Sequence, residues 1–155
     1  MCAASTYNIV MEADATQYDP RYLAGIVLFN RGDFFEAHEV WESLWMETFT
    51  PEKKFYQGLI QAAVGLLHFC NENVAGAAKL YRSSREYMLR YGSPFLGLNQ
   101  DAFWGQMDRC FAELMAQPAP SREVTIKEEL IPTIELNPAP AAWPDPAPFL
   151  DEEHG

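Results

Sequence analysis

The chain has 155 residues, 48% of them hydrophobic and 14% aromatic, which is enough to bury the core of one folded domain. Its 11 basic and 22 acidic residues give a net charge of −11, which argues against nucleic acid and anionic membranes as partners. No stretch reaches the ~18 consecutive apolar residues of a membrane span, and residues 1–15 do not resemble a secretory signal. We therefore expect a soluble, cytoplasmic protein.

Two helices are predicted first in the chain. Asp19 precedes a proline and is expected to cap a helix of about 11 residues that ends at Gly32. The second helix starts at Asp33, where Glu36 three residues later predicts a capping box. This helix is expected to end near Thr48.

Three further helices are predicted between residues 50 and 117. Thr50 and the proline after it are expected to start the third helix, which runs to Cys70 and is apolar on nearly every side. A helix without a polar face should be covered by its neighbours, so we expect it to be central. Asn73 and Asn99 are expected to cap the fourth and fifth helices, and the fifth ends at Gln117.

The composition changes after Gln117, because eight of the eleven prolines lie between Pro118 and Pro148. Proline fixes its own φ and lacks an amide donor, so the segment is expected to be extended rather than helical. We divide the chain into an N-terminal arm (1–18), a helical domain (19–117) and a proline-rich acidic tail (118–155). Within the tail, VTIKEELIPTIEL is expected to dock on the bundle, and the part after it to be mobile.

Several kinds of site are not indicated by the sequence. It contains no Gly-rich phosphate loop, G-x-S-x-G elbow or H-E-x-x-H motif. The three cysteines, Cys2, Cys70 and Cys110, form no C-x-x-C pair, so they predict neither a disulfide framework nor a cysteine zinc site. No catalytic residue is assigned.

The second helix carries a histidine and a glutamate that we expect to point inward. At about 100° per residue, His38 and Glu42 fall on the same side as Trp41 and Trp45, and Glu39 falls at the edge of that side. A buried carboxylate needs a hydrogen bond, a counter-charge or a cation. His38 lies one helical turn before Glu42, so a His–Glu pair is the minimum solution.

The third helix has a narrow polar stripe formed by Gln57, Gln61 and His68. If the second and third helices form an antiparallel hairpin, His38, Glu42 and His68 converge, with Gln61 beside them. Imidazole and carboxylate groups suit zinc, iron or manganese. A mononuclear or water-filled site fits a single H-x-x-x-E better than a dinuclear site. A network that only fixes helix register, and direct acid–base catalysis, both stay open.

Two stretches, FNRGDFFEAHEVWESLW and FYQGLIQAAVGLLHFCNENVAGAAKLY, resemble the small prokaryotic domain-of-unknown-function family 309 over roughly residues 20–115. The motif characteristic of that family is H-x-x-x-E-x-x-(W/Y), and His38, Glu42 and Trp45 match it. The resemblance implies an all-α, bundle-like domain and a motif suggested to bind metal. The long proline-rich tail departs from the shortest members of the family.

We carry three hypotheses for function. In the first, His38 and Glu42, with His68 or Gln61, bind a divalent metal (zinc, manganese or iron) or a small ligand. In the second, the protein is a non-enzymatic helical interaction module with a purely structural His–Glu pair. Such a module would hold a partner, or another copy of itself as a homo-oligomer, through an aromatic groove or through its tail. In the third, the pair serves an acid–base hydrolase, which requires Glu42 to be reachable from solvent.

Overall fold

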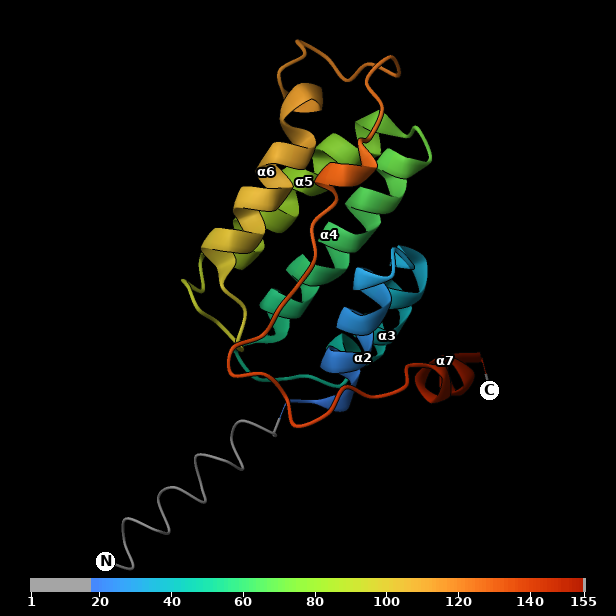
Figure 1. Cartoon of the computed structure of the whole chain (residues 1–155), viewed down its shortest axis with the longest axis vertical. Coiled ribbons are helices and arrows are strands. Elements are labelled where there is room, and N and C mark those ends of the chain that lie inside the picture. The colour runs from blue at the N-terminus through green and yellow to red at the C-terminus, as the bar shows by residue number, and fades with distance from the viewer. Residues whose placement is uncertain (1–17, 155) are drawn as a thin grey trace, which may run out of the picture.

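Our computed structural model describes residues 18–154, with side chains through Leu150. The regular structure of these residues consists of six α-helices and one 3-10 helix (Figure 1). The predicted N-terminal arm lies outside these residues apart from Tyr18. The helices are α2 (Pro20–Asn30), α3 (Phe34–Met46), α4 (Lys53–Cys70), α5 (Val74–Leu89), α6 (Gln100–Met115), η1 (Glu128–Leu130) and α7 (Ala147–His154). No β-strand occurs within this range, so the predicted all-α fold is confirmed for it.

Three of the five expected caps form as the sequence predicts. Asp19 Oδ1 accepts a hydrogen bond from the Arg21 amide at 2.8 Å at the start of α2. Asn73 Oδ1 accepts from the third amide of α5 at 3.2 Å, and Asn99 Oδ1 accepts from the third amide of α6 at 3.0 Å. Each bond satisfies an amide that has no partner inside its helix.

The other two helix starts differ from the prediction. Asp33 precedes α3 but makes no side-chain cap bond. Its own amide donates to the Leu28 carbonyl at 2.9 Å and is therefore not free for Glu36, so the capping box does not form. At the next start, the Lys53 amide donates to the Thr50 carbonyl at 3.0 Å, which makes a turn before α4 begins at Lys53.

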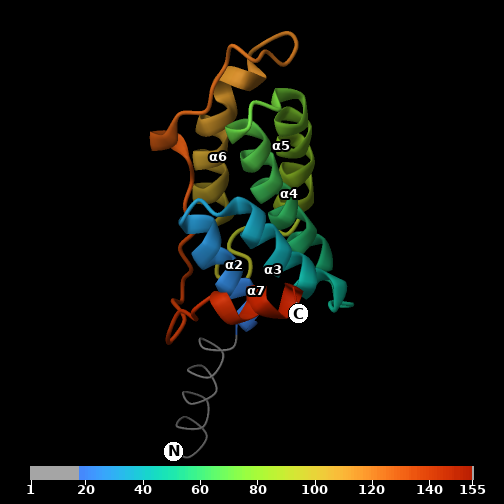
Figure 2. The ribbon, with the colours of Figure 1, turned by 90° about the vertical axis from the view of Figure 1, so that its right-hand side faces the viewer.

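Helix α4 lies between α3 and α5, while α2 packs on α3 and α6 packs on α5 (Figures 1 and 2). The core between them is largely aromatic, and its largest fully buried side chains include Trp41, Trp104, Tyr22, Phe29, Phe55, Phe103 and Phe111. The ring of Trp41 lies directly against Gly25 of α2. None of the helices in the described part is long and apolar enough to cross a membrane.

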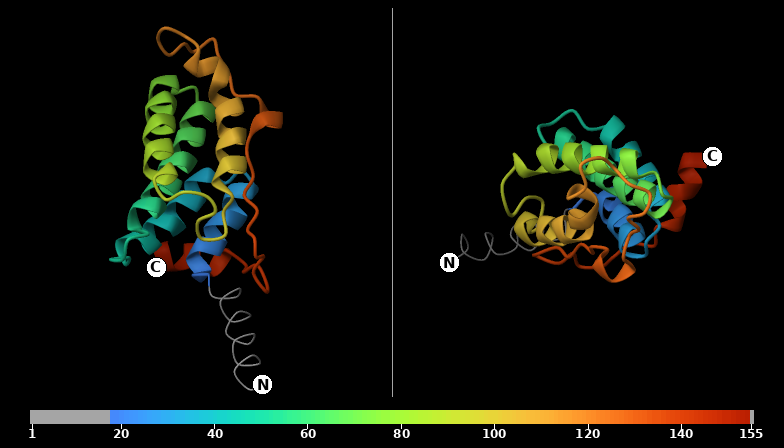
Figure 3. Two further views of the ribbon diagram at one scale, coloured as in Figure 1. Left: turned by 90° about the vertical axis from the view of Figure 1, so that its left-hand side faces the viewer. Right: turned by 90° about the horizontal axis from the view of Figure 1, so that it is seen from above.

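After α6, the chain returns along the bundle between α6 and α2 as a segment we call the strap, residues 124–137 (Figures 1 and 3). Val124, Ile134 and Leu136 are buried in the same core as the helices. The side chain of Asn30, the last residue of α2, donates to the Ile134 carbonyl at 2.9 Å and accepts from the Ile134 amide at 2.8 Å. These paired bonds fix the strap to the end of α2.

Two short helices interrupt the tail, which the proline content did not predict. One is η1, and the other is α7, which packs against α3 and lies across the lower end of α2 and α3 in Figure 2. Proline is tolerated in the first turn of a helix, so Pro148 does not prevent α7 from forming. Phe149 and Leu150 are the half-buried apolar side chains of α7.

Candidate functional site

His38 and Glu42 form the predicted pair on α3. His38 Nε2 lies 3.6 Å from Glu42 Oε2, one helical turn away. The other ring nitrogen, Nδ1, lies 3.2 Å from the Phe35 carbonyl oxygen. A carbonyl oxygen can only accept, so Nδ1 carries the proton in this contact. In a neutral imidazole, the lone pair of Nε2 would then face the carboxylate.

The pair lies at the surface rather than inside the bundle, which corrects our expectation for Glu42. The side chain of Glu42 is 49% exposed and that of His38 is 23% exposed. The buried residues of α3 are Phe34, Ala37, Val40, Trp41 and Leu44. The expected apolar face of α3 was centred on its aromatic side chains, and this placed it about 80° around the helix from the face that is buried. On the observed face, His38 lies at the edge and Glu42 lies beyond it.

Trp45 and Glu39, which the sequence placed beside the pair, are both half-buried. The Nζ of Lys53 lies 4.5 Å above the Trp45 ring, so this indole contacts a cation from the start of α4. The Trp45 Nε1 is buried without an acceptor among the described residues.

Two residues of the polar stripe of α4 contact α5 or the residue that caps it, and not the His–Glu pair. Gln61 Oε1 accepts from Ser83 Oγ of α5 at 2.5 Å. His68 Nδ1 lies 3.3 Å from Asn73 Nδ2, which can only donate, so this ring nitrogen is an acceptor. Gln57 is half-buried. Among residues 18–150, no group of three His, Cys, Asp or Glu side chains comes close enough to hold a metal ion.

A second polar cluster, formed by Tyr81, Arg85 and Asp108, joins α5 to α6 and was not predicted from the sequence. Asp108 accepts two bonds from the Arg85 guanidinium, both at 3.0 Å, and one from the Tyr81 hydroxyl at 2.6 Å. Burial, followed by the hydrogen bond to Asp108, raises the pKa of Tyr81 to about 12. Burial alone would raise the pKa of Asp108, but the bonds from Arg85 and Tyr81 hold it below its usual value. No local signal pairs Asp108 with residues on another helix.

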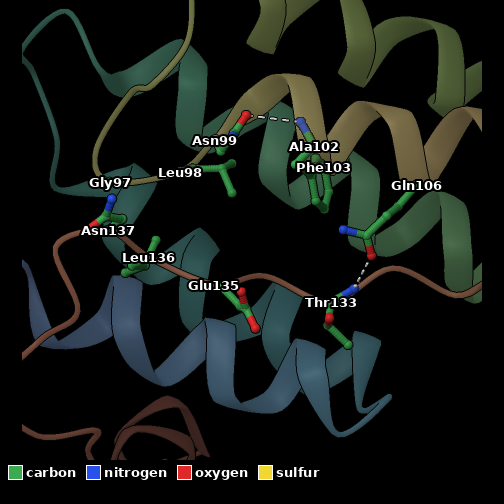
Figure 4. A pocket seen from close by; sticks show the side chains of 10 residues that line it. All are labelled: Gly97, Leu98, Asn99, Ala102, Phe103, Gln106, Thr133, Glu135, Leu136 and Asn137. Carbon is green, nitrogen blue, oxygen red and sulfur yellow. Dashed lines mark hydrogen bonds between the residues drawn. The ribbon is translucent and has the colours of Figure 1, made fainter.

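A hollow of about 370 Å³ lies between the first turns of α6 and the strap (Figure 4). Gln106 points across it and accepts from the Thr133 amide at 3.1 Å. Asn99, on the same wall, is occupied by its cap bond to Ala102. These polar groups therefore serve the attachment of the strap and the start of α6.

The fold and the pair together define an all-α helical protein with a His–Glu pair at the surface of its second described helix. Comparison with known families gives a match between residues 22–80 and a family described as "Domain of unknown function (DUF309)". The match covers most of α2, all of α3 and α4, and the first part of α5, and it includes His38, Glu42 and Trp45. It is shorter than the resemblance over residues 20–115.

Two curated relatives are similar to parts of the chain. "Uncharacterized protein YpuF" of Bacillus subtilis (strain 168) is 38% identical over 69 residues, which is 43% of this chain and 40% of that protein. An "Uncharacterized protein" of Aquifex aeolicus (strain VF5) is 29% identical over 102 residues, 65% of this chain and 31% of that protein. The chain thus spans less than half the length of either relative. No solved structure matches the chain.

Proposed function

We propose that the protein binds a divalent metal ion, such as zinc, manganese or iron, through His38 Nε2 and the carboxylate of Glu42. The observation that carries the proposal is the orientation of the imidazole. Metal-binding histidines commonly donate the other ring N–H to a carbonyl or carboxylate, which directs the free lone pair at the metal. The contact between His38 Nδ1 and the Phe35 carbonyl is of this kind.

The separation of the two candidate ligand atoms supports the same proposal. At 3.6 Å, Nε2 and Oε2 are farther apart than in a direct hydrogen bond. A metal ion bound to both atoms at ordinary distances and a tetrahedral angle needs about 3.3 Å between them. Two protein ligands leave coordination positions for water or for a small molecule, as in metal sites that bind substrates.

Metal binding can be tested on protein purified without an affinity tag and dialysed against a chelator. We expect Zn²⁺ or Mn²⁺ to bind in calorimetric titration with one site per chain. His38→Ala and Glu42→Gln should each weaken binding by at least about tenfold, the effect expected when a ligand or its support is lost. Glu36→Gln, on the same helix but away from the pair, is the matched control and should bind as the wild type does.

The same variants distinguish the proposal from a purely structural pair in a non-enzymatic interaction module. An exposed pair at this spacing contributes only about 0.3–0.5 kcal/mol, so neither substitution should unfold the protein. If metal affinity is unchanged in both variants while the melting temperature falls slightly, the pair is structural and the metal proposal is wrong.

A further inference from the structure

A hollow of about 510 Å³ lies at the end of the bundle where α2 begins, α3 ends and α4 begins. We call this site the tyrosine hollow, and its aromatic and charged lining residues are Tyr18, Asp19, Arg21, Tyr22, Glu47, Phe49, Glu52 and Tyr56. Neither His38 nor Glu42 lines it, so it is distinct from the pair on α3.

Tyr56 has a hydroxyl group without a partner in the described part of the chain. The residue is only 6% exposed and lines the hollow, yet its hydroxyl makes no hydrogen bond there. In contrast, the hydroxyl groups of the two neighbouring tyrosines are both hydrogen-bonded. Tyr22 donates to the Leu96 carbonyl at 2.9 Å, and Tyr18 donates to the Pro138 carbonyl at 2.7 Å. The unpaired hydroxyl is therefore available to a group bound in the hollow that this side chain lines.

Glu52 is the second unpaired group of the hollow. It lies one helical turn before Tyr56, at the start of α4, and makes no ion pair among the described residues. Glutamate and tyrosine at this spacing lie on the same side of a helix. A carboxylate without an ion pair and a hydroxyl without a hydrogen bond among the described residues therefore line the same hollow.

The charge of the hollow favours a cation over an anion. Arg21 is already paired with Asp19 at 3.5 Å and with Glu47 at 3.2 Å, and it also donates to the Ser43 carbonyl at 3.4 Å. Three carboxylates, those of Asp19, Glu47 and Glu52, thus line the same hollow as one guanidinium. An incoming anion would be repelled, whereas a cation would neutralise part of the excess negative charge.

The hydroxyl of Tyr56 keeps its proton in this setting. Burial, followed by the nearby carboxylates of Glu52 and Asp19, raises the pKa of Tyr56 above its usual value. A protonated phenol can still accept a hydrogen bond through its oxygen. Its ring and that of Tyr22, with centroids 5.9 Å apart, give an apolar surface beside the polar groups.

We propose that the tyrosine hollow binds a small primary amine in its ammonium form, with an apolar carbon body. The ammonium group donates to the Glu52 carboxylate and to the Tyr56 oxygen. The carbon body lies against the rings of Tyr18 and Tyr22, whose faces also attract positive charge. The volume of about 510 Å³ is within the range of small-molecule sites.

The test uses two probes of nearly the same shape, 2-phenylethylamine and the neutral 2-phenylethanol, titrated into the full chain at neutral pH and followed by NMR. We expect saturable binding of the amine and binding of the alcohol at least about tenfold weaker, as for the loss of a charged hydrogen bond. Tyr56→Phe removes only the hydroxyl, and Glu52→Gln removes only the charge. Each should weaken amine binding by about tenfold.

Two control variants test whether a loss of amine binding is specific to the tyrosine hollow. Glu86→Gln, an exposed charge on α5, should bind the amine as the wild type does, and so should His38→Ala, which separates this site from the proposed metal pair. Equal affinity for amine and alcohol, wild-type amine affinity in either Tyr56→Phe or Glu52→Gln, or no saturable binding of the amine would each overturn the proposal. Because both substitutions keep the side-chain shape, a circular-dichroism spectrum like that of the wild type will accompany each titration.

Discussion

Gly25 determines how closely α2 and α3 approach. A Cβ atom at this position would overlap the indole of Trp41, which is fully buried and donates to the Tyr22 carbonyl at 3.1 Å. We expect Gly25→Ala to lower the free energy of unfolding by about 3 kcal/mol, because the two helices would have to separate. Gly105→Ala is the matched control, since its Cβ would meet only an Arg109 nitrogen at 3.7 Å. It should raise the stability by about 0.5–1 kcal/mol. Urea unfolding measures both.

Tyr81 should make the protein sensitive to alkaline pH. The pKa of Tyr81 in the folded protein, about 12, is higher than the value of about 10 expected after unfolding. A raised pKa means that the neutral form is favoured by folding, so the stabilisation is complete below pH ~10 and is lost as the pH rises towards ~12. We expect Tyr81→Phe to reduce the loss of stability between these two pH values, measured by urea unfolding.

Tyr87→Phe, on the same helix and without a hydroxyl hydrogen bond in the described residues, is the control for this pH effect. It should follow the wild-type profile. Burial also raises the pKa of Tyr22, so some alkaline sensitivity should persist in Tyr81→Phe. An identical pH profile for Tyr81→Phe and the wild type would contradict the prediction.

At the residue scale, the spacing of His38 and Glu42 correctly predicted that the two side chains meet, because neighbours at i and i+4 follow from helix geometry alone. The direction in which they point was wrong for Glu42. The apolar face of α3 includes Ala37 and Leu44, whose burial depends on α2 and α4. The Asp108 cluster could not be predicted at all, because it needs the pairing of two helices that are separate in sequence.

At the scale of elements, Asn30 should control the attachment of the strap. Its side chain is the partner of both backbone groups of Ile134. We expect Asn30→Ala to lower the free energy of unfolding by about 1–2 kcal/mol and to speed amide exchange at Ile134. Asn71→Ala, at an exposed position where the side chain makes no hydrogen bond among the described residues, should change neither. Unchanged exchange at Ile134 in Asn30→Ala would show that other contacts hold the strap.

The five bundle helices were predictable because their boundaries depend on neighbouring residues. The caps at Asp19, Asn73 and Asn99 need only a side chain and an amide two or three positions away. The capping box at Asp33 failed for a less local reason, since the end of α2 had already used the amide that the box requires. Helix α7 was missed because its surroundings are rich in proline, while its contacts are with α3.

At the scale of the whole molecule, the family match covers a shorter part of the chain than the residues that form the folded core. Residues 22–80 end inside α5, whereas Phe103 and Phe111 of α6 and the strap residues Ile134 and Leu136 belong to the same core. Tyr81, the first residue after the match, stacks on Phe111 with ring centroids 4.8 Å apart. The matched segment therefore contains the His–Glu pair but only part of the apolar core that stabilises the fold.

Removing residues 118–155 tests whether the strap belongs to this core. A chain that ends at Gln117 loses three buried aliphatic side chains, Val124, Ile134 and Leu136, each of which stabilises a fold by about 1.5–3 kcal/mol when fully buried. Ordering the strap offsets part of that gain. We still expect the melting temperature to fall by several degrees and the fluorescence of a dye that binds apolar surface to rise. A chain that ends at Pro140 keeps the strap and loses α7, so its melting temperature should lie between those of the shorter chain and the wild type. If the chain ending at Gln117 is as stable as the wild type, the strap only lies on the bundle and contributes nothing to its stability.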